Sequence, residues 1–373
     1  QLSNTVLGLY NAMSGSAFSN ATVFALGIQP YINASIIIEL LCIAIPALER
    51  LAKDEGEEGK KKIQKITRYT TVGLSLLMGI AYYIMLKNAS AQYSILEQTS
   101  FVSGMVIVMT FMAGAAFLMW VGEQIDQFGI GNGISMILFA GIVSRVPSMV
   151  GSLFSLKWYV AILMVVGMLA IVMFIVFISN SERRIPVQYA KRVVGRKMYG
   201  GQSTNLPIKV NTAGVVPIIF ASAILYLPAQ LAVFFPSVEW VQGFANALST
   251  GWINWVLSVV LIVAFAYFYS SMVFNPTETA DQLRKQGGFI PGVRPGAATA
   301  AYIKSAIDHV TLPGALFMAV LAVVPTIIFW FTGNSLIQAF GGTSVLIMVG
   351  VAMDTLSSIE SQLKMHNYDG FFK

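Results

Sequence analysis

The hydrophobic residues of this chain lie in long blocks separated by polar segments, not at the three-to-four-residue spacing of a helix on a soluble protein. A block of about 20 apolar residues can cross the hydrocarbon core of a bilayer as a helix. Each block is expected to be helical, because hydrocarbon offers no water to the backbone N–H and C=O groups. The nine predicted spans are Ile28–Leu48, Tyr69–Leu86, Phe101–Val121, Ile134–Val150, Trp158–Ile178, Val215–Phe235, Trp252–Phe274, Val310–Phe331 and Thr343–Leu363.

The composition agrees with an integral membrane protein. Of the 373 residues, 56% are hydrophobic and 11% are charged, whereas a soluble domain carries roughly 25% charged residues. The chain therefore lacks the polar surface of a water-soluble fold. Its single cysteine, Cys42, lies within a predicted span and cannot form an internal disulfide.

The basic residues lie almost entirely on one side of the predicted bilayer. If the spans alternate in direction, the segments Glu49–Arg68, Ser179–Gly214 and Asn275–His309 share one side with the C-terminal tail. Together they hold all of the 23 Lys and Arg residues except Lys87, Arg145 and Lys157. Because Lys and Arg collect in cytoplasmic loops, this side and the C-terminus are expected to be cytoplasmic.

In this orientation the first predicted span runs inward, so residues 1–27 are expected outside the membrane. The apolar segment Asn4–Phe18 is too short to span, since spanning takes about 20 residues. It is predicted to be either an interfacial helix or a short re-entrant helix inside a protein cavity. Because Gln1 is not a start residue, we also expect at least one further span to precede the sequence given.

The loops Ser179–Gly214 and Asn275–His309 are longer than orientation signals require. They combine charge with turn-forming pairs such as Pro291-Gly292 and Pro295-Gly296. Shaped basic loops of this kind indicate a docking surface for a large cytoplasmic partner.

The sequence contains no P-loop, no G-x-S-x-G and no H-E-x-x-H motif. His309 and His366 stand apart, so no metal site and no cofactor are expected. The run Gly129–Gly133 is predicted to form a tight turn between two spans.

Glu39 is the clearest ionisable residue within a span, where burial of a charge costs about 2.5–3.5 kcal/mol. It is therefore expected to face a polar cavity or a partner, or to be protonated.

Six segments of the chain together resemble one family, the SecY proteins, which form the channel subunit of the bacterial protein translocase. The resemblance extends over essentially the whole chain. The segments are FALGIQPYINASIII (Phe24–Ile38), GIGNGISMILFAGIV (Gly129–Val143), ERRIPVQYAKR (Glu182–Arg192), QSTNLPIKVNTAGVVPIIFASAI (Gln202–Ile224), NPTETADQLRKQGGFIPGVRPG (Asn275–Gly296) and FGGTSVLIMVGVAMD (Phe340–Asp354).

The resemblance implies an all-α membrane fold of ten transmembrane helices, arranged as two pseudo-symmetric halves clasped around a pore. The nine predicted spans then correspond to the second to tenth helices, and the expected preceding span to the first. Residues 28–150 would form the N-terminal half and residues 151–373 the C-terminal half. Residues 1–27 would hold a short re-entrant helix, the plug, with the residues Leu7, Leu9, Tyr10 and Met13.

The family closes its pore with a ring of apolar side chains. Bulky aliphatic groups in a narrow neck expel water, and hydrophobic constrictions gate channels in this way. By motif position, the resemblance assigns this pore ring to Ile32, Ile36, Leu138, Ile142, Ile219 and Ile347.

The family also opens sideways to lipid through a lateral gate, where signal sequences lodge. Here the gate would lie between two pairs of spans, Ile28–Leu48 with Tyr69–Leu86 and Val215–Phe235 with Trp252–Phe274. The residues assigned to it are Ser35, Glu39, Ala223 and Leu227.

The resemblance implies partners as well. Arg183, Arg184 and Arg294 lie in the two long loops that match the family's docking sites for the SecA ATPase and the ribosome. A guanidinium suits phosphate and carboxylate partners. The other expected partners are the SecE and SecG subunits, signal sequences, nascent polypeptides and the lipid bilayer, and the expected location is the bacterial cytoplasmic (inner) membrane.

The predicted function is thus a protein-conducting channel, with a polytopic secondary transporter as the alternative. A transporter predicts a polar binding site near mid-membrane depth, for which the spans offer only Glu39. An intramembrane protease would need a Ser/His pair or paired Asp residues in the spans, and neither is present. The chain is therefore predicted not to be an enzyme, and SecA or the elongating ribosome would supply the energy for transport.

Overall fold

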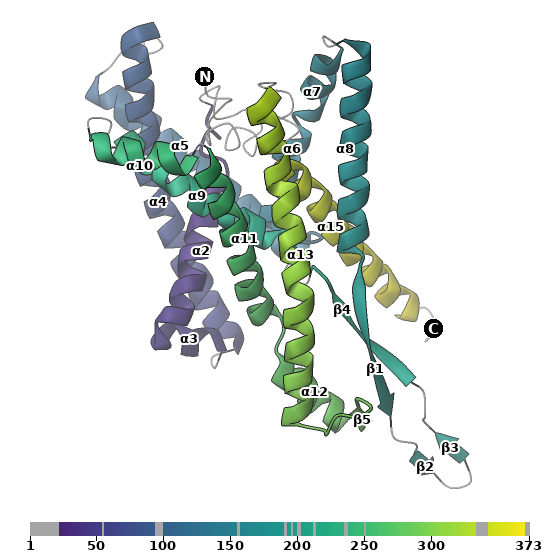
Figure 1. Ribbon diagram of the computed structural model, residues 1–373. Helices are drawn as coiled ribbons and strands as arrows, with labels where there is room; N and C mark the ends of the chain where they lie inside the picture. Colours follow the sequence, from purple (N-terminus) through teal and green to yellow (C-terminus); the bar gives the residue numbers. More distant parts are fainter. Residues whose placement is uncertain are drawn as a thin grey trace.

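The computed structural model of this protein describes residues 22–53, 56–93, 100–154, 157–189, 192–194, 197–199, 203–211, 214–234, 238–249, 251–332 and 342–369. This part of the chain is a bundle of long helices with strands at one end (Figure 1). The predicted plug residues Leu7, Leu9, Tyr10 and Met13 lie outside the described residues.

Within the described residues, six helices are long and apolar enough to cross a membrane, and three shorter apolar helices accompany them. Every predicted span overlaps one of these helices, so the chain is a multi-pass membrane protein. The long helices are α4 (Gly56–Tyr93), α5 (Phe101–Phe128), α8 (Trp158–Ser179), α11 (Trp252–Val273), α13 (Ala297–Thr332) and α15 (Gly342–Asp369). The shorter ones are α2 (Gln29–Ala44), α6 (Gly133–Val143) and α9 (Val216–Phe234).

Two of the predicted spans are interrupted. The first, Ile28–Leu48, breaks at Ile45, whose backbone is extended (φ −111°, ψ 111°). Pro46 explains this break, because a proline disfavours helical backbone in the residue before it, and a short helix, α3 (Pro46–Lys53), follows. The second, Ile134–Val150, is divided by a turn into α6 and α7 (Val146–Leu153).

The prediction of an all-α fold is wrong in the two long basic loops. β1 (Glu182–Tyr189) pairs antiparallel with both β4 (Ser203–Lys209) and β5 (Gly288–Phe289), so the two loops share one three-stranded sheet. Figure 1 shows the sheet at one end of the bundle, near α12 (Pro276–Lys285). A separate two-stranded hairpin consists of β2 (Arg192–Val194) and β3 (Lys197–Tyr199).

A small apolar core holds the sheet against a helix. Ile185 and Val187 alternate inward along β1 and are buried in one cluster with Ile303 and Ile307 of α13. This packing explains why α13 begins at Ala297, well before the predicted span Val310–Phe331. The first turns of α13 cover the sheet, and only its later part meets lipid.

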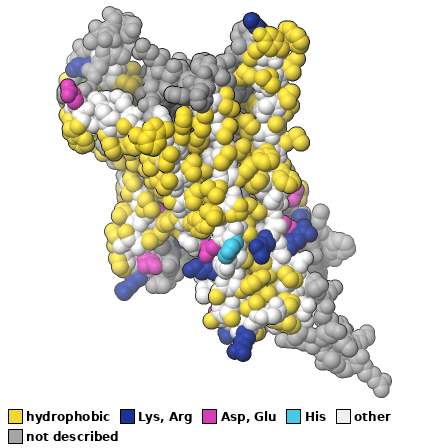
Figure 2. All heavy atoms as spheres, viewed as in Figure 1, with side chains coloured by type: hydrophobic (Ala, Val, Ile, Leu, Met, Phe, Trp, Pro, Cys, Tyr) yellow, Lys and Arg dark blue, Asp and Glu magenta, His cyan; other side chains and the backbone are white. Residues whose placement is uncertain are grey.

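The main apolar core lies inside the bundle and draws on helices from α2 to α15. Apolar side chains also cover much of the outside. Figure 2 shows them over most of the described surface of the bundle, with Lys and Arg gathered mainly in its lower part, towards the sheet. An extensive exposed apolar surface is typical of a protein that faces lipid.

One further helix, α10 (Glu239–Ser249), corresponds to no predicted element. It lies between α9 and α11 in the sequence and contacts both. In Figure 1 it lies across the long helices and not along them.

Candidate functional site

The six residues predicted to form the pore ring come from four helices and are all buried. All six belong to the main apolar cluster, and their exposed fractions lie between 0% and 5%. They are Ile32 and Ile36 on α2, Leu138 and Ile142 on α6, Ile219 on α9 and Ile347 on α15.

Helix geometry and helix contacts describe how these residues are arranged. Ile32 and Ile36 are four residues apart, as are Leu138 and Ile142, so each pair lies on one face of its helix. α9 contacts α2 and α15, and α15 contacts α6. The four helices are thus linked in sequence by the contacts of α2 with α9, α9 with α15 and α15 with α6.

The glycine run Gly129–Gly133 sets where α6 begins. The predicted tight turn is confirmed: Gly131 has a positive φ of 82°, and α6 starts two residues later. The Asn132 side chain caps the helix, its Oδ1 accepting from the Ser135 N–H at 3.0 Å. Asp126 Oδ1 accepts from the Gly133 N–H at 2.7 Å and so ties the start of α6 to the end of α5.

Gly133 also permits a close approach of α6 to α5. A Cβ at this position would collide with the carbonyl oxygen of Gly122 on α5. Because a backbone oxygen cannot move aside as a flexible side chain can, a larger residue would push α6 away. The buried position of Leu138 and Ile142 on α6 therefore depends on this contact.

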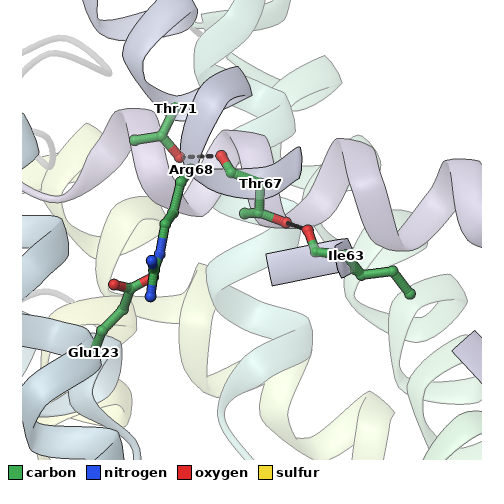
Figure 3. A network of polar contacts seen from close by, with 5 residues as sticks. All are labelled: Ile63, Thr67, Arg68, Thr71 and Glu123. Atoms are coloured by element: carbon green, nitrogen blue, oxygen red, sulfur yellow. Dashed lines mark hydrogen bonds and ion pairs between the residues drawn. The ribbon is translucent and has the colours of Figure 1, made fainter. Parts of the chain in front are cut away.

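An ion pair joins α4 to α5 one residue after Gly122 (Figure 3). Arg68 Nε donates to Glu123 Oε1 at 2.7 Å, and the Glu123 side chain is only 4% exposed whereas that of Arg68 is 45% exposed. Next to Arg68, the hydroxyls of Thr67 and Thr71 donate to backbone carbonyls one turn earlier on α4, at 3.0 and 2.7 Å. A buried carboxylate needs such a partner, because an unpaired charge is costly to bury.

Sequence reasoning missed this ion pair. Arg68 was counted among the loop charges, and the predicted span Phe101–Val121 ended before Glu123. A signal was present, since Arg68 directly precedes one span and Glu123 comes two residues after the end of the next. In two consecutive antiparallel helices these positions lie at the same end.

The predicted gate residues lie on α2 and α9, which contact each other. Ala223 is buried, Ser35 and Glu39 are half-buried, and Leu227 is 39% exposed. α9 also contacts α4 and α11. Within the described residues, Glu39 Oε2 is buried without a hydrogen-bond partner.

The three predicted docking arginines are exposed and lie at the sheet end of the bundle. Arg183 and Arg184 are on β1, and Arg184 Nε donates to Glu182 Oε1 at 2.7 Å. Arg294 lies in the turn between β5 and α13, where its carbonyl accepts from the Thr299 hydroxyl at 2.9 Å. Because β1 pairs with β5, the same sheet supports both loops.

In the described part of the chain, no group of three or more His, Cys, Asp or Glu side chains could hold a metal ion. Among the described residues, the polar groups on these helices and their neighbours include the Arg68–Glu123 pair, the capped turn before α6 and Glu39. They also include the buried side chains of Gln29, Asn33, Ser222 and Ser344. These features define a class of protein: a multi-pass membrane protein whose helices share one large buried apolar core.

Comparisons with known proteins agree with this class. The sequence model of the SecY family matches residues 22–356. The protein translocase subunit SecY of Mycobacterium bovis is 42% identical over 391 residues, covering 99% of this chain and 87% of the relative. The protein translocase subunit SecY of Streptomyces scabiei is 43% identical over 389 residues, with the same coverage.

Solved structures share the fold at lower identity. A structure of a protein conducting channel has a TM-score of 0.68 at 18% identity and covers 94% of this chain and 84% of its own. Sec61 in a canine ribosome-channel complex from the endoplasmic reticulum has a TM-score of 0.61 at 16% identity, covering 94% of this chain and 84% of its own.

This chain belongs to the SecY family. It is a protein-conducting channel, and the comparisons do not favour the alternative of a secondary transporter. The family is one of protein translocase subunits and not of enzymes.

The buried ion pair predicts an asymmetric effect on stability. Arg68→Met leaves the Glu123 carboxylate buried and unpaired, so it should lower the free energy of unfolding by about 3 kcal/mol. This value is the lower end of the range for a broken buried pair, because Arg68 is half exposed. Glu123→Gln should lower the free energy of unfolding by less, because the half-exposed Arg68 side chain can turn to water. Unfolding of the purified protein in a denaturing detergent measures both.

Arg184→Met is the matched control, since it breaks a pair of the same length on the surface. It should cost no more than about 1 kcal/mol. The double variant Arg68→Met/Glu123→Gln should recover part of the loss of Arg68→Met. Equal losses for the two single variants, or strict additivity, would contradict the account.

Proposed function

We propose that this channel carries secretory polypeptides across the bacterial cytoplasmic membrane and releases the helices of membrane proteins sideways into it. One observation carries the proposal: six aliphatic side chains from α2, α6, α9 and α15 converge in a single buried cluster. A channel that passes chains of any sequence needs a constriction that offers them no specific hydrogen bond. Aliphatic groups meet this need.

In the proposal these six residues form the pore ring, which retains ions by dewetting. A neck lined only by Ile and Leu has nothing to replace the hydration shell of an ion, so an ion would have to shed water without compensation. When a polypeptide enters, the same side chains can close around it by van der Waals contact. Residues 1–27 would lie on the external side, where Leu7, Leu9, Tyr10 and Met13 would form a plug.

Residues 28–150 and 151–373 are proposed to be the two halves of the channel. The ring supports this division, since Ile32, Ile36, Leu138 and Ile142 come from the first half and Ile219 and Ile347 from the second. The lateral gate would open where α2 and α4 of the first half meet α9 and α11 of the second. Ser35, Glu39, Ala223 and Leu227 would line it.

Separation at this gate would expose a translocating segment to lipid. An apolar segment would then leave the channel, driven by about 0.8 kcal/mol for each CH₂ group that it buries. A polar segment would continue through the ring. Glu39, whose Oε2 has no hydrogen-bond partner among the described residues, would lie beside this path.

The proposed docking surface consists of the exposed Arg183, Arg184 and Arg294, with the C-terminus on the same cytoplasmic side. Their guanidinium groups suit the phosphates of ribosomal RNA and the carboxylates of an acidic protein surface. SecA and the ribosome are the proposed partners there and would supply the energy, with SecE and SecG as the other subunits. No cofactor is proposed for this chain.

The pore ring predicts an ion leak when its side chains become polar. Ile219→Asn combined with Ile347→Asn should raise the ion conductance of the closed channel, because the amides hydrate the neck. Planar-bilayer recording of the reconstituted channel measures this. The control is Ile162→Asn on α8, where the side chain is 56% exposed on the outside of the bundle. An unchanged conductance of the double ring variant would contradict the assignment.

The docking surface predicts a loss of motor-driven transport with the channel intact. Arg294→Glu should impair SecA-driven translocation of a secretory precursor, because the charge reversal repels an acidic partner surface. Lys285→Glu at the end of α12 makes the same charge change in the same loop and should have a smaller effect. Normal translocation by Arg294→Glu, or equal impairment by both variants, would rule out a specific role for Arg294.

A further inference from the structure

α10 (Glu239–Ser249) joins α9 to α11 at the end of the bundle away from the sheet (Figure 1). The proposed channel function gives it no role. At a rise of 1.5 Å per residue, its 11 residues extend only about 16 Å. The hydrocarbon core is about 30 Å thick, so α10 cannot span it. Its orientation across the long helices agrees with a position along the membrane surface.

One flank of α10 packs against the protein. Ala245 is 4% exposed, and the Gln242 side-chain amide donates to the Ala232 carbonyl of α9 at 2.6 Å. This bond links α10 to the last turn of α9. It thereby holds the helix in a defined rotation about its own axis.

That rotation leaves two other flanks outward. Successive residues are about 100° apart around a helix, so Trp240, Phe244 and Ala247 share one outward flank. Trp240 is 74% exposed and Phe244 is 55% exposed, and Ala247 is also exposed. Glu239, likewise exposed, lies between the aromatic flank and the packed one. The helix therefore presents a protein-packed, an aromatic and an acidic flank.

The surface next to α10 is also apolar. α10 contacts α11, and the first turns of α11 expose Trp252 (69%), Ile253 (37%) and Val256 (54%). α11 is long and apolar enough to cross the membrane, so its exposed first turns are expected to face lipid. α10 thus contacts a helix that offers an exposed apolar surface at its start.

We propose that α10 is an interfacial helix, lying in the boundary between headgroups and acyl chains of the leaflet opposite the basic loops. Trp240 and Phe244 insert among the lipids, and Glu239 is directed to water. Trp is enriched at this depth, because its ring is apolar while its N–H seeks a polar partner. Helices of this kind bury their apolar face about 5–10 Å into the boundary.

The charge of α10 indicates whether anionic lipid contributes to its binding. Its sequence, EWVQGFANALS, contains one acid and no Lys or Arg. Attraction to anionic headgroups therefore contributes nothing, and insertion depends on apolar contact alone. The helix should reach the same depth in vesicles of pure phosphatidylcholine as in vesicles with anionic lipid.

The test measures the depth of single positions in the full chain, assembled with its partner subunits and reconstituted in phosphatidylcholine vesicles. Cys42→Ser removes the only cysteine, and one new cysteine is labelled with an environment-sensitive fluorophore. The lipid-facing positions are Trp240→Cys, Phe244→Cys and Ala247→Cys, the last of which keeps both aromatic rings. Glu239→Cys is the matched control on the same helix.

We expect the labels at 240, 244 and 247 to emit at shorter wavelength than the label at 239. A nitroxide near the start of the acyl chain should quench the fluorescence of these three labels. Iodide present on both sides of the membrane should not quench it. The label at 239 should show the reverse. Iodide quenching at 240, 244 and 247 equal to that at 239 would overturn the proposal in favour of a water-facing helix. Protection from both quenchers would overturn it in favour of a protein cover.

Discussion

In the proposed channel, the mutual packing of aliphatic side chains at the neck is the interaction on which the rest of the structure depends. A closed channel must separate two aqueous spaces with groups that require no polar partner of their own, and Ile and Leu satisfy this condition. Ile32, Ile219 and Ile347 are each less than 5% exposed although they come from three different helices. Such a seal holds only if each helix is placed accurately, because an aliphatic contact has no directional bond to correct its position.

The polar groups of the protein supply that placement from outside the neck. The capped turn before α6 and the close contact of Gly133 with Gly122 position α6 against α5. The Arg68–Glu123 pair then joins α5 to α4, one of the helices proposed to form the gate. In this proposal, directional interactions position the helices, while the six ring residues themselves are all aliphatic. The sheet at the basic end also separates apolar from charged groups, since Ile185 and Val187 are buried and Arg183 and Arg184 on the same strand are exposed.

Much of this architecture was predictable from the sequence, because membrane insertion is decided locally by runs of apolar residues. All nine predicted spans overlap helices, and the turn at Gly129–Gly133 was anticipated. The strands were missed because β1 and β5 lie far apart in the chain and pair only after folding. The alternation at Ile185 and Val187 was the available signal for β1. The Arg68–Glu123 pair was missed because each charge was assigned to the loop next to it. α10 was missed because its apolar run is too short for a span.

The central claim is that a translocating polypeptide passes through the neck formed by these six residues. The most direct measurement places a photoreactive cross-linking amino acid at each of them in turn, with a secretory polypeptide stalled midway through the channel. The account predicts adducts with the polypeptide from all six positions, including Ile36, Leu138 and Ile347, and none from Ile162 on the outer face of α8. Failure of the ring positions to cross-link a polypeptide that has demonstrably entered the channel would contradict the account.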